Sequence, residues 1–437
     1  MLKSFVYSWT IYWGLILLLP VHSIYPSATL AFLLQMTFVA LVSVGYLIAR
    51  LSTLGVRAPD SRTGHIPAAR SVVRMSIYLS VFGLLFLVYD KVAIQGIDYS
   101  EGLAVAREQW RVIGEEREGT ASSIWSALGY LIGSAYYVTI VMLLTQPQSF
   151  SARERLGIAS TAFIFALLNS VITGGRSNFM LLGVFAVAAM SARRNLSIRL
   201  IFPDRRQRRA LSAVTFLALA YMVYVFYARA EAGGELVSLY VVNFLPYMGL
   251  DFDNWYLQAS SNESVATVGN MTILVGGYLS HSLATFAAIL DVPQEDKIML
   301  FGNAASILYK LGLTGKPDDG WFLAGRFPSV PGALWHQYGP AGFLLGSVLL
   351  GVVAGLTTAW ASLASCRLLP LGMYAMVSAT LILTPYVFAP DFLSFPFVFS
   401  SFVMLSVFAR FGFEQRRAKS RKRPPAHQIN RAPQHFS

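Results

Sequence analysis

Long apolar stretches, separated by short polar segments, make up most of the 437-residue chain. A helix that crosses a membrane needs about 20 mainly apolar residues, and ten stretches qualify. The pattern therefore predicts an all-α polytopic membrane protein with about ten transmembrane helices. The stretches are residues 5–21, 27–50, 72–94, 122–145, 155–172, 177–193, 210–228, 337–362, 368–388 and 393–411.

Three of the stretches raise two further questions. Residues 155–172 and 177–193 are joined by only four residues, which fits either two full spans or a kinked, partly re-entrant pair. The first stretch has the short basic and apolar start that a removable signal peptide also has. Pro20-Val21-His22 follows it without a small-x-small cleavage site, so we expect a retained first span.

Two longer segments are expected on the outer side. Residues 95–121 are charged but carry Leu103, Trp110 and Ile113 at near-helical spacing, which predicts an amphipathic helix on the membrane surface. Residues 229–336 are too long for a simple connection, and their apolar runs predict several surface helices. The predicted organisation is spans one to seven in 1–228, an extracytoplasmic (periplasmic) loop at 229–336, spans eight to ten in 337–412 and a basic cytoplasmic tail at 413–437.

The charges indicate an orientation. The chain carries 34 Lys and Arg against 22 Asp and Glu, a net charge of +12. With ten alternating spans and both termini in the cytoplasm, the cytoplasmic segments hold 24 basic and four acidic residues, and the outer segments hold 10 basic and 18 acidic residues. Because Lys and Arg concentrate on the cytoplasmic side of membrane proteins, the basic excess reports topology and attraction to anionic membrane lipid, and no nucleic-acid partner is expected.

The remaining composition excludes several classes of protein. Charged residues are 13% of the chain, half the roughly 25% of soluble domains, which argues against a soluble enzyme. Cys366 is the single cysteine, and the six histidines show no HxxxH or HxH spacing, so no metal site is expected. No Walker or dinucleotide motif occurs, and we expect no cofactor.

The turn between the fifth and sixth stretches is the first candidate site. It reads Thr173-Gly174-Gly175-Arg176-Ser177 and lies at the outer face. Two glycines permit a tight turn with outward amide groups, and Ser177 can cap the following helix, whose N-terminus favours anions. The planar guanidinium group of Arg176 can donate paired hydrogen bonds to phosphate oxygens. The alternative is a simple helical hairpin whose arginine extends to lipid headgroups.

Two further outer arginines join this candidate. Arg229 lies at the outer end of the seventh stretch, and Arg326 lies just before the chain re-enters the membrane. Three arginines that meet on one face would suit a diphosphate. The alternatives are a surface ion pair of Arg229 with Glu231 or Glu235, and ordinary solvation of Arg326.

Candidate bases lie in the same outer loop. His281 and His336 are predicted at the outer face, where a neutral imidazole accepts protons near pH 7. Asp253 lies in a segment rich in aromatic residues, a setting that suits sugar binding or deprotonation of a hydroxyl. For each of the three, a purely structural role is the alternative: a hydrogen-bonded histidine, or an aspartate that caps a helix.

Part of this pattern resembles a known family. The Thr173–Ser177 turn, the long outer loop and the sequence Pro331-Gly-Ala-Leu-Trp-His336-Gln-Tyr-Gly339-Pro-Ala-Gly-Phe343 resemble the oligosaccharide repeat unit polymerases, the Wzy-type O-antigen polymerases of bacteria. The resemblance covers mainly residues 160–192 and 320–350, and the rest matches in topology.

The resemblance implies a GT-C-like fold with an outer substrate cavity and metal-independent glycosyl transfer in lipopolysaccharide biosynthesis. Such enzymes join undecaprenyl-diphosphate-linked oligosaccharides at the outer face of the bacterial cytoplasmic (inner) membrane, and a chain-length regulator co-polymerase is the implied protein partner. It also implies that Arg176, Arg229 and Arg326 bind the diphosphate, with Gly174, Gly175 and Ser177 beside them.

Two other functions stay open. An O-antigen ligase would share the chemistry and differ in its acceptor. A transporter or flippase for lipid-linked sugars would instead carry charged residues at mid-membrane, and no acid or base lies clearly at the centre of a predicted span. Among the bases, His281 is preferred over His336 and Asp253.

Overall fold

The computed structural model describes most of the chain as helices. The described residues are 1–53, 69–116, 123–173, 177–192, 201–202, 204–232, 237–259, 263–292, 300–302, 305, 309, 313–315, 327–363, 367–392 and 394–421. The α-helices within them are α1 (Leu2–Leu18), α2 (Ala28–Ser52), α3 (Ala69–Val88), α4 (Leu103–Glu116), α5 (Ile124–Gly133), α6 (Tyr136–Thr145), α7 (Ala152–Thr173), α8 (Ser177–Ser191), α10 (Arg205–Ala232), α11 (Val237–Tyr247), α12 (Asn254–Ala259), α13 (Glu263–Asp291), α15 (Val330–Leu363), α16 (Leu368–Leu383) and α17 (Ser394–Arg421).

Shorter elements complete the fold. A π-helical turn, Tyr89–Ile94, extends α3, and two 3-10 turns are formed by Pro147–Ser149 and Ala389–Asp391. The strands β1 (Val21–Ser23) and β2 (Leu250–Phe252) pair antiparallel, with His22 opposite Asp251. This ribbon ties the connection between α1 and α2 to the segment that follows α11.

Seven helices among the described residues are long and apolar enough to cross a membrane. Six of them coincide with predicted stretches: Ala28–Ser52, Ala69–Ile94, Ile124–Thr145, Ala152–Thr173, Val330–Leu363 and Ser394–Phe411. The apolar helices at Ser177–Ser191 and Leu368–Leu383 are shorter, α1 has 17 residues, and several side chains of α10 lie outside the described set. The chain is therefore an all-helical protein with seven candidate spans, and the count of ten stays a prediction.

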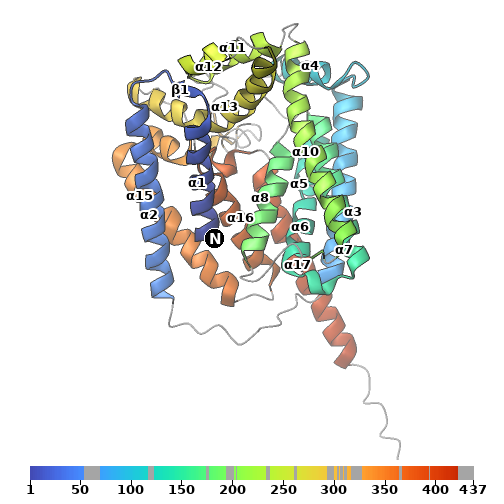
Figure 1. Cartoon of the computed structure of the whole chain (residues 1–437). Coiled ribbons are helices and arrows are strands. Elements are labelled where there is room, and N and C mark those ends of the chain that lie inside the picture. Colours follow the sequence, from blue (N-terminus) through green and yellow to red (C-terminus); the bar gives the residue numbers. More distant parts are fainter. Residues whose placement is uncertain are drawn as a thin grey trace, which may run out of the picture.

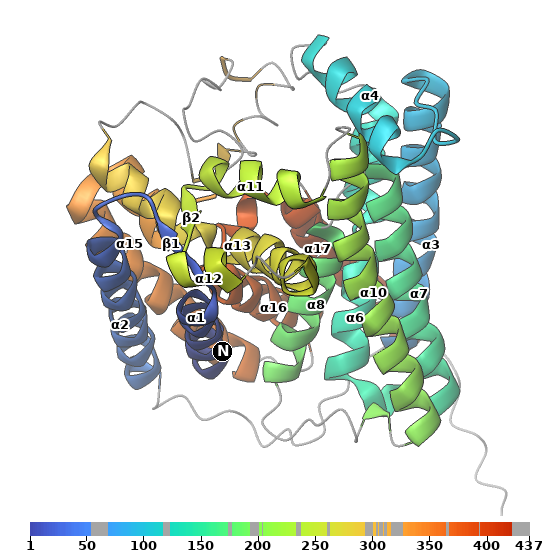
Figure 2. The same cartoon turned by 45° about the horizontal axis from the view of Figure 1, so that its top comes forward.

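The seventh candidate, Thr272–Asp291, is part of α13 and lies in the predicted outer loop. Figures 1 and 2 show α13 crossing one end of the bundle, from the side of α10 towards α2. Ser282 contacts Tyr12 near the end of α1, and at the far end the Asp291 carboxylate accepts hydrogen bonds from the Ser27 hydroxyl and from its amide. Since Ser27 directly precedes α2, α13 is fastened across that end of the bundle. It packs against α1, α2 and α15, and most of its apolar part is buried within the protein.

Glycines set the closest helix contacts. A Cβ on Gly351 of α15 would lie 2.1 Å from the Val42 carbonyl oxygen of α2, and one on Gly83 of α3 would lie 2.3 Å from Gly133 of α5. Small residues four apart let membrane helices approach until their backbones touch. Gly351 and Gly355, like Gly129 and Gly133, have this spacing. These two helix pairs therefore pack by backbone contact, which side chains of ordinary size would prevent.

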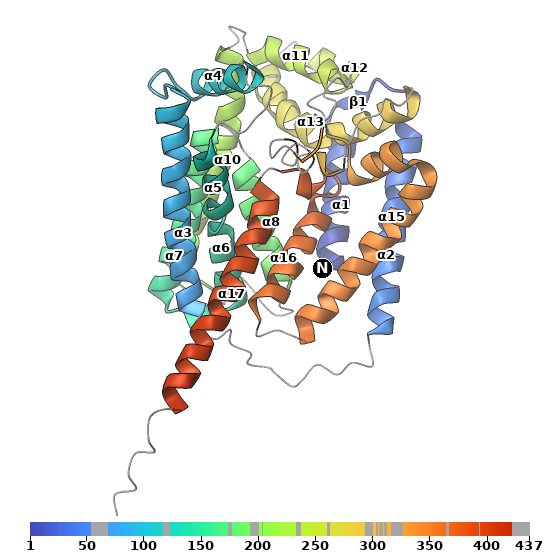
Figure 3. The same ribbon diagram turned by 180° about the vertical axis from the view of Figure 1, so that it is seen from behind.

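Two predicted stretches are interrupted. The stretch 122–145 divides into α5 and α6 at Ser134 and Ala135, where the helical ladder is broken. In α15, Gly339 adopts φ +64° and precedes Pro340, a backbone conformation that glycine adopts without steric cost. The break separates a short outer segment that carries His336 from the long membrane helix. Figure 3 shows α5 and α6 following one another along the bundle, and the break between them falls near the middle of the candidate span Ile124–Thr145.

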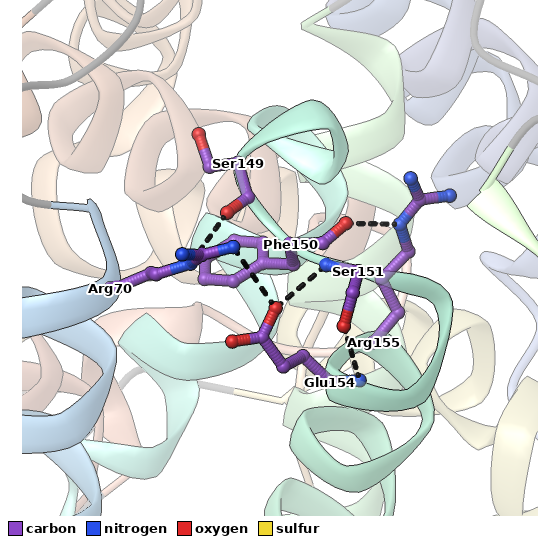
Figure 4. Close-up of polar contacts among 6 residues, drawn as sticks. All are labelled: Arg70, Ser149, Phe150, Ser151, Glu154 and Arg155. Atoms are coloured by element: carbon purple, nitrogen blue, oxygen red, sulfur yellow. Dashed lines mark hydrogen bonds and ion pairs between the residues drawn. The ribbon is translucent and has the colours of Figure 1, made fainter.

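The opposite end of the bundle carries basic residues. Figure 1 shows the end of α2 and the starts of α3, α7 and α10 at this end, as the positive-inside orientation predicts. There Arg70 donates to the Ser149 carbonyl (3.1 Å) and to the Glu154 carboxylate (3.3 Å). Ser151 and Glu154 accept each other's backbone N–H groups and form a capping box at the start of α7 (Figure 4).

Candidate functional site

A cavity of about 200 Å³ lies directly beside the turn between α7 and α8. Thr173 and Ser177, the described residues on either side of that turn, both line it. Six separate elements contribute to the lining: α4, α5, α6, α7, α8 and α17. The lining residues are Trp110, Gly129, Tyr130, Ser134, Tyr136, Asn169, Thr173, Ser177, Asn178 and Ser394.

Several polar groups on the wall are already committed to one hydrogen bond. The Ser134 hydroxyl donates to the Tyr130 carbonyl (3.0 Å), and the Thr173 hydroxyl donates to the Asn169 carbonyl (2.7 Å). The Asn169 amide group donates to the Phe165 carbonyl (2.8 Å). Each hydroxyl has a single proton, so Ser134 and Thr173 retain only acceptor capacity.

Tyr136 is the exception on this wall. Its residue is 2% exposed, and its hydroxyl meets full hydrogen-bond geometry with none of the described residues, although the Tyr137 hydroxyl is near enough to interact with it. The neighbouring Tyr137 ring lies 4.1 Å away between centroids, but the Tyr137 hydroxyl donates to Asn178 (3.2 Å to Oδ1). A buried, unpaired hydroxyl is costly and calls for an explanation. Among the described lining residues, Tyr136 is the one whose buried hydroxyl lacks a hydrogen bond.

A buried charged cluster lies behind the cavity. Asp90 is 0% and Lys91 2% exposed. Gln95 joins them, because its amide donates to the Asp90 carboxylate (2.6 Å) and its carbonyl oxygen accepts from the Lys91 ammonium (3.2 Å). The Ser123 hydroxyl donates to the other Asp90 oxygen (2.6 Å). We refer to Asp90, Lys91, Gln95 and Ser123 as the buried charge cluster.

The π-helical turn explains how two consecutive charged residues both face inward. The wider turn bonds the Gln95 N–H to the Asp90 carbonyl (2.9 Å), five residues back, and brings the Gln95 side chain onto both charges. π-helical turns are rare and are frequent at functional sites. Asp90 and Lys91 fall near the end of the predicted stretch 72–94, and the sequence alone indicated no role for them. An adjacent acid and base at the end of an apolar run was the available signal.

Two aromatic residues connect this cluster to the cavity. The Lys91 ammonium lies 4.4 Å from the centre of the Trp110 ring, a cation–π contact, and Trp110 lines the cavity. The Tyr99 hydroxyl donates to the Ile172 carbonyl (2.8 Å), next to Thr173. Burial and the Asp90 carboxylate raise the pKa of Tyr99 to about 12, so the phenol keeps its proton and its hydrogen bond at any physiological pH.

The predicted arginines are not placed by the structure. Gly174, Gly175, Arg176 and Arg326 lie outside the described residues, and of Arg229 only the backbone, near the end of α10, is described. The shared diphosphate site therefore stays a prediction.

His281 is held by hydrogen bonds at both ring nitrogens. Its Nδ1 donates to the Tyr278 carbonyl (2.6 Å), and its Nε2 accepts from the backbone N–H of Phe327 (3.2 Å). This pattern fixes the neutral tautomer with the proton on Nδ1. The ring is 3% exposed and fastens the segment next to Arg326 onto α13. A structural role for His281 thus has direct support, whereas its role as a base stays a prediction.

The other two candidate bases lie elsewhere on the outer end. His336 is buried at 7% exposure on the short outer segment of α15. Asp253 follows β2, and its carboxylate pairs with His22 Nδ1 at 2.9 Å, with both side chains partly open to solvent. None of the three candidates is among the residues that line the cavity. The sequence therefore found the turn at the cavity, but not the other groups around it.

The described residues show no group of three His, Cys, Asp or Glu side chains that could hold a metal ion. Comparisons with protein-family models, with curated proteins and with solved structures find no match to this chain. The fold and the cavity therefore stand on the sequence and the geometry alone, and together they describe a multi-pass helical membrane protein with a polar cavity at the end opposite the basic residues.

Proposed function

We propose that the protein is a glycosyltransferase that polymerises lipid-linked oligosaccharides. It joins polyprenyl-diphosphate-linked repeat units at the outer face of the bacterial cytoplasmic membrane, within a ten-span, GT-C-like fold. The observation that carries the proposal is the cavity bounded by Thr173 and Ser177. The turn that resembles the polymerases thus borders a polar space on the predicted outer side of the bundle.

The chemistry needs few parts. The donor sugar leaves a lipid diphosphate, which is already activated, so no nucleotide is consumed. A hydroxyl of the acceptor unit attacks the anomeric carbon, the bond to the diphosphate oxygen breaks, and the hydroxyl proton passes to a base. Negative charge grows on the diphosphate as the bond breaks, and preorganised arginines stabilise that charge. Arg176, Arg229 and Arg326 are the proposed partners of the diphosphate, and metal plays no part in the proposed transfer.

The base is proposed among three side chains. His281 is the first choice from the sequence, and Nε2 is its available acceptor atom only if the bond from Phe327 opens. His336 and Asp253 follow. Lipid tails of donor and acceptor stay in the bilayer, against the apolar outward faces of the helices.

Arg176→Ala tests the proposal. The change is made in the full-length protein in its native host, and the surface polysaccharide is displayed as a length ladder. We expect the ladder to collapse to single repeat units, while membrane abundance of the protein is unchanged. Arg206→Ala, an exposed arginine at the opposite end of the bundle, is the matched control and should leave the ladder intact. An intact ladder with Arg176→Ala removes the role given to Arg176.

A lipid-linked sugar transporter is the second candidate, and the buried Asp90 and Lys91 favour it. Ionisable residues within membrane segments commonly mark transport paths. Purified protein in vesicles separates the two functions. Polymer made from lipid-linked units without any ion gradient supports the enzyme, whereas movement of these units across the bilayer without polymer supports the transporter. Transfer to lipid A-core alone would indicate a ligase.

A further inference from the structure

We propose that the cavity beside the α7–α8 turn binds a single neutral, hydroxylated sugar ring. Resting on the proposed function, this is the ring that carries the lipid diphosphate, because Arg176 comes between Thr173 and Ser177 in the sequence and both of these line the cavity. The cavity then determines which sugar the protein accepts at that position.

The hydrogen-bonding state of the wall selects the ligand class. Ser134 and Thr173 have donated their only hydroxyl protons to helix carbonyls, so towards the cavity they can only accept. Asn169 uses one amide hydrogen on the Phe165 carbonyl and retains its carbonyl oxygen and a second N–H. A ligand that satisfies these three acceptors must present hydroxyl or amide donors. Phosphate oxygens only accept and would leave the Ser134 and Thr173 hydroxyl oxygens unmatched.

Tyr136 supplies the complementary group. Its buried hydroxyl lacks a partner among the described residues and can donate to a ring or hydroxyl oxygen of the ligand. A sugar ring offers both donors and acceptors around its edge, which matches a lining that also carries the N–H or O–H groups of Trp110, Tyr130, Ser177 and Ser394. The described lining residues carry no charged side chain, as a neutral ligand requires.

The aromatic wall fits the faces of a ring. Trp110 and Tyr130 both line the cavity, and rings of this kind pack against the C–H face of sugars through apolar contact. The Lys91 ammonium lies over the Trp110 ring, and Gln95 and Asp90 hold that ammonium in turn. The buried charge cluster is therefore a positioning device for Trp110, not a direct ligand contact.

The size of the cavity suits a single ring. Pockets for drug-sized ligands measure about 300–1,000 Å³, and this cavity measures about 200 Å³. One sugar ring suits this space, and further rings of a repeat unit would lie outside the cavity.

The test is direct binding without turnover. Full-length protein is placed in lipid nanodiscs, since maltoside detergents carry sugar headgroups, and saturation-transfer NMR is recorded with four methyl glycosides: glucoside, galactoside, rhamnoside and N-acetylglucosaminide. Inorganic pyrophosphate is added as competitor in a separate series. We expect one of the four glycosides to bind until its site is saturated. Pyrophosphate should not displace it.

Variants assign that binding to the cavity. Tyr136→Phe removes only the hydroxyl and should weaken the glycoside about three- to tenfold, the range expected for one neutral hydrogen bond. Trp110→Leu should weaken it further. Tyr374→Phe is the control, because this buried tyrosine hydroxyl lies on α16, outside the cavity lining, and bonds to Met1 and Ser191.

Three results overturn the proposal. They are the absence of saturation with every glycoside, displacement of the bound glycoside by pyrophosphate, and equal affinity of Tyr136→Phe and wild type in a protein of wild-type thermal stability. A glycoside-soaked structure that holds only an ordered water beside Tyr136 would likewise show that no glycoside binds there. Glycoside binding without polymer formation in vesicles would refute the proposed function and leave the sugar site standing. Conversely, polymer formation that is unchanged in Tyr136→Phe would refute the sugar site and leave the proposed function standing.

Discussion

At the scale of single residues, the buried charge cluster is the most demanding feature of the protein. Two opposite charges out of reach of water are tolerated when each keeps its hydrogen-bond partners, and removing one partner is much more costly than removing both. Gln95 supplies bonds to both charges. The cluster therefore behaves as one unit.

Asp90→Ala should destabilise the protein by about 3–5 kcal/mol, because it leaves the Lys91 ammonium buried without its counter-charge. The double change Asp90→Asn with Lys91→Met should recover part of that loss, since both charges are then absent. Thermal unfolding in nanodiscs, followed by tryptophan fluorescence, measures both. Equal loss in the single and double variants would contradict the coupling.

His281 is the second residue with a clear physical prediction. His281→Ala removes the acceptor of the Phe327 N–H and should lower the free energy of unfolding by about 1–3 kcal/mol. The polymer should also become shorter. His22→Ala, at an exposed imidazole, is the control. Full thermal stability combined with lost activity would instead favour a chemical role for the ring.

At the scale of helices, packing rests on backbone contact. Gly351→Ala places a methyl group 2.1 Å from the Val42 carbonyl oxygen, so α2 and α15 must separate. We expect a loss of about 1–3 kcal/mol, the usual cost of overpacking. Gly183→Ala is matched in residue type and helical setting but meets nothing within 4 Å. Its thermal midpoint should equal or exceed that of the wild type, and a similar loss in both variants would refute the close-contact explanation.

The start of α7 offers a second prediction at this scale. Ser151→Ala removes the hydroxyl that accepts the Glu154 N–H, and loss of such a cap costs about 1 kcal/mol. Thr37→Ala removes an exposed hydroxyl bonded within its own helix and should have little effect. Comparison of the two midpoints checks the cap, and an unchanged midpoint for Ser151→Ala would show that Glu154 alone is sufficient.

At the scale of the whole molecule, the prediction concerns topology. In a Cys366→Ser background, Trp255→Cys and Gly315→Cys introduce thiols at exposed positions on either side of α13 in the sequence, and Arg206→Cys introduces one at the basic end. If α13 lies across the outer end, a membrane-impermeant maleimide should label the first two in spheroplasts and spare the third. Labelling of only one of the first two would mean that α13 crosses the membrane.

The sequence predicted much of the fold because membrane helices depend on composition. Six predicted stretches match helices long enough to span, and the amphipathic segment around Trp110 forms α4. The predicted loop helices are present as α11, α12 and α13. Prediction from the sequence reaches its limit at Thr272–Asp291. This helix belongs to the predicted outer loop, yet it is as apolar as a candidate span. Hydropathy alone does not distinguish lipid from protein as the surroundings of a helix.

The candidate site was only partly predictable. The glycine-arginine turn is visible in sequence because turn chemistry is local. Asp90, Gln95 and Tyr136 lack such a signal, since their importance comes from neighbours on other helices.

The sequence by itself determined that the chain is a membrane protein and which end is basic, because apolar length and charge placement are summed along the chain. Only the tertiary structure decided that α5 and α6 part beside the α7–α8 turn, that a cavity lies there, and that one tyrosine hydroxyl within it is unpaired. The physical reason is that hydrogen-bond satisfaction and cavity shape depend on which helices touch, and that arrangement is not encoded in any one segment.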